Sequence, residues 1–369
     1  MSTVVFAPDS FKGSIAAAAA ASALADGWAQ ARPGDRAILR PMADGGEGTL
    51  EAFAVAVPGA VRMPVVVDGP DGRRTDAAWL LLPPTPDAPS GTGVVELAST
   101  SGIELLGARL LPDSAHTRGF GQAIAAALDH GVSRLVLGIG SSASTDGGTG
   151  LLTALGARFA DASGVSIRPG AEGLIDLAAA DLTSLRSPPV AGAVVLTDVT
   201  NPLLGPTGSA AVFGPQKGLD PAGVARAEAG LARLADLLGT DPATAGAGAA
   251  GGAGYGLLAW GARLVPGSAE VAALIGLAEA IAEASVVVTG EGSFDGQSAA
   301  GKAPTHVAAL AAAAGIPVAL VGGRIAADAD ASGFAASVSL TDLAGSSDAA
   351  IDEPARWLRL AGAALARLL

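Results

Sequence analysis

Short apolar runs alternate along the chain with Ala- and Leu-rich stretches of helical length, and this alternation restricts the fold more than any other feature. Strands are expected at Val4–Ala7, Ala37–Arg40, Val132–Gly138, Ala193–Thr197, Val286–Thr289 and Val318–Val321. Helices are expected at Ser14–Ala31, Glu47–Val57, Thr117–His130, Pro221–Leu238, Ala303–Ala314 and Ala349–Leu368. Strands that alternate with helices are typical of an α/β fold with a mostly parallel sheet.

Three segments depart from this alternation. Val61–Leu82 has apolar runs on both sides of Asp68-Gly69, which predicts strands joined by turns in an antiparallel insert. Pro83–Pro86 and the Gly/Ala-rich stretch Gly246–Gly256 are expected to be loops or linkers.

The composition excludes several classes of protein. With 369 residues, 50% of them hydrophobic, the chain can form a sizeable core and about two domains. A net charge of −13 repels phosphate backbones, so we expect no nucleic-acid partner. Cysteine is absent, which removes disulfides and Cys-ligated metals and fits a reducing, cytoplasmic location.

The N-terminal region has some features of a targeting segment. The apolar run Ile15–Ala25 ends in Ala23-Leu24-Ala25, which mimics a cleavage site. Asp9 precedes the run, however, and cleavage would remove the expected first strand Val4–Ala7, so we expect no signal peptide. The sequence has no uninterrupted apolar run of the ~18 residues that a membrane span needs, so we also expect no membrane partner.

Lysine is scarce in this sequence. Of the 22 basic residues only Lys12, Lys217 and Lys302 are lysines, and each adjoins a glycine. An ammonium is a compact point charge, unlike the planar arginine fork, so lysines retained in an arginine-rich chain indicate functional sites. Asn201 is likewise the only asparagine.

Nearly every expected strand that precedes a helix ends in a loop rich in Gly, Asp and Ser. The carboxyl ends of parallel strands lie at one edge of a sheet, which is the usual ligand crevice. We therefore expect these loops to form a composite site. The loops are Asp9–Ser14, Asp44–Gly48, Gly138–Gly150, Asp198–Gly208 and Gly290–Lys302.

Two of the loops have the chemistry of anion binding. In Asp44-Gly45-Gly46-Glu47-Gly48 the glycines let the backbone approach a ligand at an expected helix start. Gly138–Ala143 matches the dinucleotide fingerprint G-x-G-x-x-A. The residues that follow it are poor helix formers, so we interpret this loop as a nest of N–H and hydroxyl groups.

Two further segments carry candidate ligands. Gly296–Ala303 nearly matches a P-loop, but Ala303 lacks the hydroxyl that would bind Mg²⁺, so only Lys302 is kept as a candidate phosphate ligand. Around several prolines and glycines, the side chains of Asp198, Asn201, Gln216 and Lys217 can hold a metal, a carboxylate or a phosphate.

Five blocks of the sequence resemble the bacterial glycerate kinase family, the type that includes the enzymes of glyoxylate and glucarate catabolism. They keep the family's order between residue 4 and about residue 323, and are Ala7–Ser14, Met42–Thr49, Thr197–Leu203, Phe213–Gly218 and Thr289–Gly292. Two departures are present. The family's usual Gly-Gly-Ser-Ala-Thr-Asn-Asp-Gly-Gly loop reads Gly-Ser-Ser-Ala-Ser-Thr-Asp-Gly-Gly at 140–148, and Ser293 stands where an arginine is common.

The resemblance implies two α/β domains, one of them an open, mostly parallel Rossmann-like sheet built from both chain ends, with the active site in the cleft between the domains. We place the domains at residues 1–60 plus 265–369 and at residues 61–264. The resemblance also implies ATP-dependent, Mg²⁺-assisted phosphorylation of D-glycerate, most often to 2-phosphoglycerate.

Phosphoryl transfer needs positioning and charge compensation more than covalent chemistry. We expect Lys12 and Lys217 to neutralise the substrate carboxylate and the transferring phosphoryl group, with Lys302 on the nucleotide side. Asp198 and Glu291 are the expected Mg²⁺ ligands, and Asp44 is the candidate base with Asp146 as second choice. The other expected substrate- or phosphate-binding residues are Ser10, Gly45, Gly46, Glu47, Ser141, Ser142, Asp146, Gly147, Gly148, Asn201 and Gln216.

Two alternatives stay open on the sequence alone. One is an NAD-dependent 2-hydroxy acid dehydrogenase that uses Gly138–Ala143, and the other is a non-catalytic nucleotide- or acid-binding protein. The sequence also leaves open the 2- or the 3-hydroxyl as acceptor, the preferred hydroxy acid and the oligomeric state.

Overall fold

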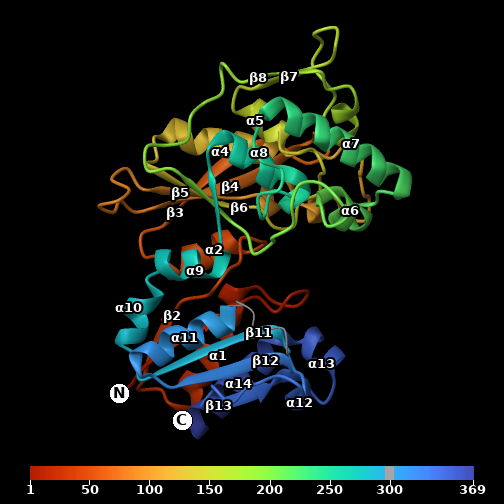
Figure 1. The fold of residues 1–369 in the computed structure, drawn as a ribbon. Coiled ribbons are helices and arrows are strands. Elements are labelled where there is room, and N and C mark those ends of the chain that lie inside the picture. Colours follow the sequence, from red (N-terminus) through yellow and green to blue (C-terminus); the bar gives the residue numbers. More distant parts are fainter. Residues whose placement is uncertain (296–302) are drawn as a thin grey trace. The chain divides into compact units, whose positions relative to one another are not determined.

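The computed structural model describes residues 1–295 and 303–369, and the chain divides into two compact units. Unit 1 consists of Met1–Asp44, Glu51–Pro58 and Ser268–Leu369, and unit 2 of Gly45–Leu50 and Gly59–Gly267. Both chain ends therefore belong to unit 1, where the red and blue segments meet (Figure 1). The predicted domain boundaries and the predicted position of the active site between the domains stay predictions.

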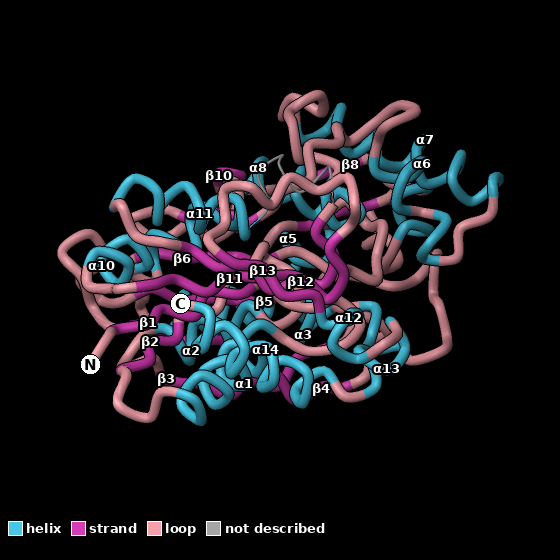
Figure 2. The backbone as a smooth tube through the Cα atoms, turned by 90° about the horizontal axis from the view of Figure 1, so that it is seen from below, coloured by secondary structure: helices cyan, strands magenta, loops and turns pink. Residues whose placement is uncertain are grey.

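Unit 1 contains a five-stranded sheet in which every pair of neighbours is parallel. In sheet order its strands are β13 (Ala336–Ser339), β12 (Val318–Ile325), β11 (Val286–Phe294), β1 (Thr3–Pro8) and β2 (Arg36–Leu39). Helices α1 (Ala17–Ala31) and α14 (Pro354–Leu368) lie side by side (Figure 2) and pack on this sheet around Phe6, Leu24 and Leu358.

Small residues allow α1 and α14 to pack at backbone distance. A side chain at Gly27 would collide with the carbonyl of Arg359, and one at Gly362 would collide with the carbonyl of Leu24. Helix α1 begins three residues later than the expected Ser14, because Phe11 and Ile15 pair with each other in a tight turn. The expected helix Ala349–Leu368 is two helices, since Pro354 cannot continue a helix that precedes it.

The remaining helices of unit 1 are short or connect the units. They are α10 (Leu277–Ala282), α11 (Ala303–Ala314), α12 (Leu340–Ala344) and α13 (Ser347–Asp352), while α2 (Thr49–Ala56) and α9 (Gly267–Leu274) each include residues of both units.

Unit 2 contains a six-stranded sheet that is parallel over four strands and antiparallel at one edge. In sheet order its strands are β10 (Arg263–Val265), β9 (Ala193–Leu196), β6 (Arg134–Gly138), β5 (Thr92–Glu96), β4 (Arg74–Leu82) and β3 (Val61–Asp68). The antiparallel pair β3–β4 is the predicted insert. The predicted α/β class with mostly parallel sheets is confirmed.

The rest of unit 2 surrounds this sheet. The helices are α3 (Ala98–Ser101), α4 (Arg118–His130), α5 (Thr149–Ala154), α6 (Ser209–Phe213), α7 (Pro221–Leu238) and α8 (Ala253–Trp260). Four 3-10 turns, η1 (Ile103–Leu106), η2 (Ala171–Ile175), η3 (Pro215–Lys217) and η4 (Ala249–Gly252), and a separate pair of strands, β7 (Arg158–Ala160) and β8 (Ala179–Asp181), complete it.

The expected loop Gly246–Gly256 is wrong from Ala249 onward, where the chain forms η4 and the first turn of α8. Its glycines serve close packing, since a side chain at Gly251 would collide with the carbonyl of Ser144.

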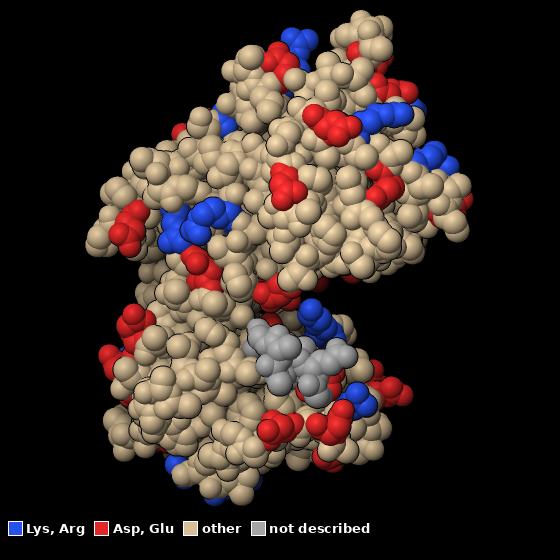
Figure 3. All heavy atoms as spheres, viewed as in Figure 1, with Lys and Arg blue, Asp and Glu red and all other residues tan. Residues whose placement is uncertain are grey.

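The described residues contain no helix long and apolar enough to cross a membrane. On the face drawn in Figure 3, acidic and basic side chains are interspersed over both units.

Candidate active site

Lys12 lies at the tip of a tight turn that follows β1. The turn is closed by the Phe11 N–H, which donates to the Ile15 carbonyl over 2.9 Å, and Gly13 takes the left-handed backbone conformation at φ 75° that the turn requires. The Lys12 side chain is 82% exposed. The turn therefore presents a solvated ammonium at the carboxyl end of the sheet of unit 1.

Asp44 comes to the same edge through the segment that follows β2. The Met42 N–H donates to the Pro8 carbonyl over 2.9 Å, which keeps this segment beside the end of β1. The Asp44 Oδ2 atom lies 3.5 Å from the Lys12 Nζ atom. An exposed pair at this distance contributes little to stability, so the ammonium is available to a ligand at small cost.

Glu291 lies inside strand β11. The loop that was expected to begin at Gly290 is therefore wrong over its first residues, which continue the strand. Strand β11 continues to Phe294 because Glu291 pairs with Gly322 and Ser293 with Arg324 on β12. Glu291 is 9% exposed. Its neighbour Gly292 packs against the Lys12 backbone, because a side chain at Gly292 would lie 3.2 Å from the backbone nitrogen of Lys12.

Asp9 is a further residue of this group, although the sequence did not single it out as a candidate ligand. Its N–H donates to the Gly290 carbonyl over 2.8 Å, and its Oδ1 atom accepts from the Ser10 N–H over 2.6 Å. Burial, with the charge of Asp44 as the next cause, raises the pKa of Asp9 to about 6 against the opposing effects of Ser10 and Lys12. Asp9 follows directly after strand β1, and this position could have identified it, because the other candidate loops were also chosen for following a strand.

In unit 2, Gly45 and Gly46 pack against the loop that follows β6. The Gly140 N–H donates to the Gly45 carbonyl over 2.9 Å, and a side chain at Gly140 would meet the Gly46 Cα atom at 2.5 Å. A side chain at Gly138 would meet the Gly45 carbonyl oxygen at 2.7 Å. The glycines therefore allow the backbone of the Gly45-Gly46 segment to contact the backbone of the Gly138–Gly140 segment. Close packing is thus sufficient to explain why glycine occupies these positions.

The next residues lead into helix α2, which begins at Thr49 and not at the expected Glu47. Glu47 is exposed, whereas the buried Glu96 at the end of β5 accepts from the Leu50 N–H over 3.0 Å. Glu96 was not among the expected residues.

Lys217 is buried, which distinguishes it from Lys12. It ends η3, is 3% exposed, and its Nζ atom donates to the Ser142 Oγ over 2.7 Å and to the Ser144 carbonyl over 2.5 Å. Burial lowers the pKa of Lys217 to about 7, and the charge of Asp146 opposes this shift. In this structure Lys217 holds the 142–146 loop in place.

Asp146 is also fully buried and bonded to neighbouring backbone. Its Oδ2 atom accepts from the Thr117 N–H at 2.9 Å and the Thr117 hydroxyl at 2.8 Å, and its Oδ1 atom accepts from the Gly148 N–H at 3.1 Å. These contacts tie the starts of α4 and α5 together. They support a positioning role for Asp146 more than its second-choice role as a base.

The remainder of the 140–148 loop carries further hydroxyls. Ser141 is exposed and takes a positive φ of 58°, and Gly147 and Gly148 also have positive φ angles. Among the described residues, the buried hydroxyls of Ser144, Thr145 and Ser209 have no hydrogen-bond partner.

The other expected residues of unit 2 lie after β9 and around η3. Asp198 is exposed, and its Oδ1 atom accepts from the Gly267 N–H over 2.9 Å. The Asn201 amide donates to the Thr207 carbonyl over 2.7 Å, and Gln216 is exposed beside the buried Lys217. Lys302 lies outside the described residues.

The structure thus brings the expected residues together in two groups. In unit 1 the group is Ser10, Lys12, Asp44 and Glu291, with Asp9 added. In unit 2, Lys217 contacts Ser142 and Ser144 and lies in the field of Asp146, and Gly45 and Gly46 pack on the start of the same loop.

The segment Gly138–Ala143, which matches the dinucleotide fingerprint, is not followed by the helix that a dinucleotide site needs. Helix α5 begins only at Thr149, so no helix opens directly after the glycines. The glycines are occupied instead by the packing against Gly45 and Gly46.

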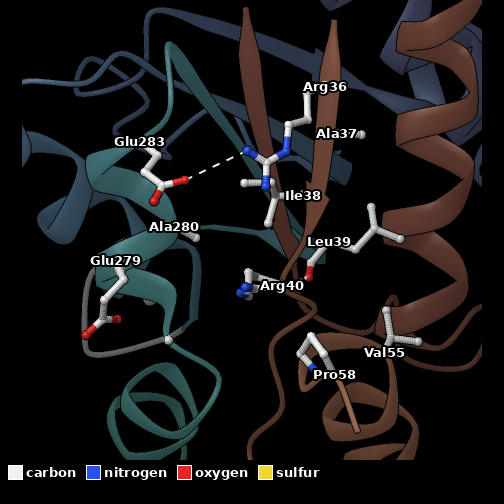
Figure 4. A pocket seen from close by; sticks show the side chains of 11 residues that line it. Arg36, Ala37, Ile38, Leu39, Arg40, Val55, Pro58, Glu279, Ala280 and Glu283 are labelled. Carbon is white, nitrogen blue, oxygen red and sulfur yellow. Dashed lines mark hydrogen bonds and ion pairs between the residues drawn. The ribbon is translucent and has the colours of Figure 1, made fainter.

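A cavity of unit 1, about 580 Å³, lies away from this group of residues. It is lined by β2, the end of α2 and α10, and Figure 4 shows Arg36 facing Glu283 across it, with 3.9 Å between their charged atoms. Both side chains are exposed, and no described residue of the lining belongs to the expected set. We assign it no part in the candidate site.

Ligands of open, parallel α/β sheets bind at the carboxyl ends of the strands, and Lys12, Asp9 and Asp44 lie at that edge of the sheet of unit 1, which makes the chain a ligand-binding α/β protein. A model described as the glycerate kinase family matches residues 4–369. The chain belongs to the glycerate kinase family. It is accordingly an enzyme that phosphorylates an alcohol group, and glycerate is the substrate that this membership supports.

Individual relatives agree with the family. The chain is 39% identical to glycerate kinase of Bacillus subtilis over 336 residues, covering 89% of this chain and 86% of the relative. It is 38% identical to glycerate 2-kinase of Escherichia coli over 334 residues, covering 88% of this chain and 86% of the relative. A crystal structure from Salmonella typhimurium LT2, provisionally named glycerate kinase 2, has a TM-score of 0.84 and 36% identity and covers 99% of this chain and 97% of that one.

Proposed function

We propose that the protein transfers the γ-phosphoryl group of ATP to the 2-hydroxyl of D-glycerate, which gives 2-phosphoglycerate and ADP. The observation that carries this proposal is the group at the carboxyl edge of unit 1, where Lys12, Asp9, Asp44 and Glu291 place one ammonium among three carboxylates. A relative named glycerate 2-kinase supports the choice of hydroxyl.

The carboxylates of this edge are suited to Mg²⁺. Among residues 1–295 and 303–369, no three Asp, Glu, His or Cys side chains form a ready-made metal site. Mg²⁺ commonly takes only one or two carboxylates and completes its shell with phosphates and water, so Glu291 suits a nucleotide-bound ion. The role of Asp198 as a ligand stays a prediction from the sequence. Bound Mg²⁺ would supply charge neutralisation at the phosphate oxygens.

The side chains of this chain supply the remaining steps in the proposal. Lys12 compensates the negative charge of the phosphoryl group or of the substrate carboxylate, and Asp44, 3.5 Å from it, accepts the proton of the substrate hydroxyl. Lys217 acts through the 142–146 loop, whose Ser142 hydroxyl it orients by a 2.7 Å hydrogen bond. Lys302 is proposed to contact the nucleotide.

A coupled assay of ADP release with D-glycerate, ATP and Mg²⁺ tests the proposal. Release of ADP that depends on D-glycerate is the expected result. A protein that binds ATP but releases no ADP would be a non-catalytic binder. A thermal shift with NAD but none with ATP and Mg²⁺ would favour a dehydrogenase.

A further inference from the structure

A second cavity of unit 1, about 370 Å³, opens at the far end of β11. Its lining comes from the end of that strand, from α11 and from the segment between β12 and β13, and includes Phe294, Thr305, Asp328, Asp330, Ser332 and Phe334. Its volume falls within the range of about 300–1,000 Å³ that is usual for small-ligand pockets. None of the catalytic roles assigned above uses these residues.

Two aromatic rings form one wall of this cavity. The rings of Phe294 and Phe334 meet edge to face, with 5.7 Å between their centroids and an angle of 87°. Phe294 is 4% exposed, whereas Phe334 is only half-buried. A ring that is fixed by a buried neighbour and still partly accessible is a stacking surface for a flat heterocycle.

The polar part of the lining is acidic. Asp295, Asp328 and Asp330 contribute three carboxyl groups, and the last two are exposed. Carboxylates accept hydrogen bonds from ribose hydroxyls and from the N–H groups of a base. They repel phosphate, so a nucleotide would enter with its nucleoside in the cavity and its phosphates directed outward.

The cavity also lies at a suitable distance from the proposed chemistry. Phe294 follows Glu291 by three residues on the same strand, which is about 10 Å at the rise of ~3.3 Å per residue. That separation is comparable with the length of an extended triphosphate chain, and both ends lie at the carboxyl end of β11, where ligands of open α/β sheets bind.

We propose that this cavity binds the base and ribose of the nucleoside triphosphate that donates the phosphoryl group. The proposal rests on the proposed function, because it names the nucleotide subsite of the same reaction.

Calorimetric titration with ADP and with inorganic tripolyphosphate, combined with steady-state kinetics, tests this subsite. Phe334→Ala should weaken ADP binding and raise the KM for ATP about tenfold, the scale of one lost stacking contact. Tripolyphosphate binding and the KM for D-glycerate should stay unchanged, because neither ligand reaches the ring. Phe334→Leu keeps an apolar side chain but removes the ring, so it serves as the second variant in case Phe334→Ala weakens the fold. It should also weaken ADP binding and leave tripolyphosphate binding unchanged.

Two further variants complete the design. Asp328→Asn should weaken ADP binding without weakening tripolyphosphate binding, and Val55→Ala, in the larger cavity of the same unit, should change neither. Wild-type turnover together with unchanged ADP affinity in both Phe334 variants would overturn the subsite and leave the proposed function standing. A wild type that does not turn over ATP with D-glycerate would overturn the proposed function itself.

Discussion

Lys12 and Lys217 are the same residue type in opposite environments. The sequence singles out both by the same signal, a rare lysine beside a glycine, yet Lys12 is 82% exposed and Lys217 only 3%. The local sequence indicates that a lysine is functionally important, but it does not indicate whether the side chain is buried. Burial depends on which distant segments of the chain pack around the lysine. We therefore expect replacement of the buried Lys217 to reduce stability, and replacement of the exposed Lys12 to leave it nearly unchanged.

Replacing Lys12 with methionine should remove charge compensation and leave the fold intact. We expect kcat/KM to fall by about 10²–10³, as for other electrostatic contacts to a transition state. The thermal midpoint should stay within a degree or so, because the side chain is solvated and its ion pair is weak. A coupled ADP assay and a thermal melt measure the two quantities. A matching loss of stability and activity would mean that Lys12 is a structural residue.

Replacing Lys217 with methionine should change how stability depends on pH. The folded state holds the Lys217 proton only below about pH 7, whereas the unfolded chain holds it up to about pH 10.5. Between these values the unfolded state binds more protons, so the wild type gains stability as pH rises. The free energy of unfolding of the wild type relative to Lys217→Met should therefore rise from pH 7 to pH 10. Denaturant titrations measure it, and a flat difference would contradict the burial of the ammonium.

Asp9 should show the opposite pH dependence. Its pKa is raised from 3.8 to about 6 in the fold, so the folded state retains a proton that the unfolded chain has already lost. The wild type should lose stability relative to Asp9→Asn as pH rises from 4 to 6, and the difference should be constant above that range. Asp35→Asn is the matched control: the Ser2 N–H and the Trp28 indole lower the pKa of Asp35 below 3.8, so the wild type should gain stability relative to this variant only as pH rises towards 3.8, and the difference should be flat from pH 4 to 6. The same slope for both variants would contradict the assigned environments.

At the scale of elements, periodicity predicted what local sequence can encode. Helices α7 and α11 have the expected bounds, and β1, β6, β9 and β12 lie where apolar runs end in glycine-rich loops. The extension of β11 through Gly290 and Gly292 could not be predicted, because it depends on pairing with β12, whose strand order the sequence does not state. Strand β5 was missed because Thr92–Glu96 is a short run between polar residues.

The contact between the glycine segments gives a prediction about packing. Gly138→Ala and Gly140→Ala should each destabilise unit 2 by about 1–3 kcal/mol, since the new methyl group would lie 2.7 Å or less from the backbone of Gly45 or Gly46. Gly34→Ala is the control, because a methyl group there meets nothing within 4 Å. Chemical denaturation gives the three values. Equal stability of all three variants would show that the two backbones are not in contact.

For the whole molecule, the sequence predicted the α/β class and the expected residues in their loops, and the family was recognisable from blocks spread along the chain. In the structure Lys12, Asp44 and Glu291 belong to unit 1, and Lys217, Asp146 and Asp198 belong to unit 2. The sequence did not identify Asp9 and Glu96, because an isolated carboxylate gains meaning only from what folds around it.

The most direct test of the account is phosphorus NMR of the product formed from ATP and D-glycerate. Transfer to the 2-hydroxyl places the phosphate on a carbon with one hydrogen, so the account predicts a phosphomonoester doublet that grows together with ADP. A triplet would assign the phosphate to the 3-hydroxyl, and the absence of a new phosphomonoester would contradict the kinase activity itself.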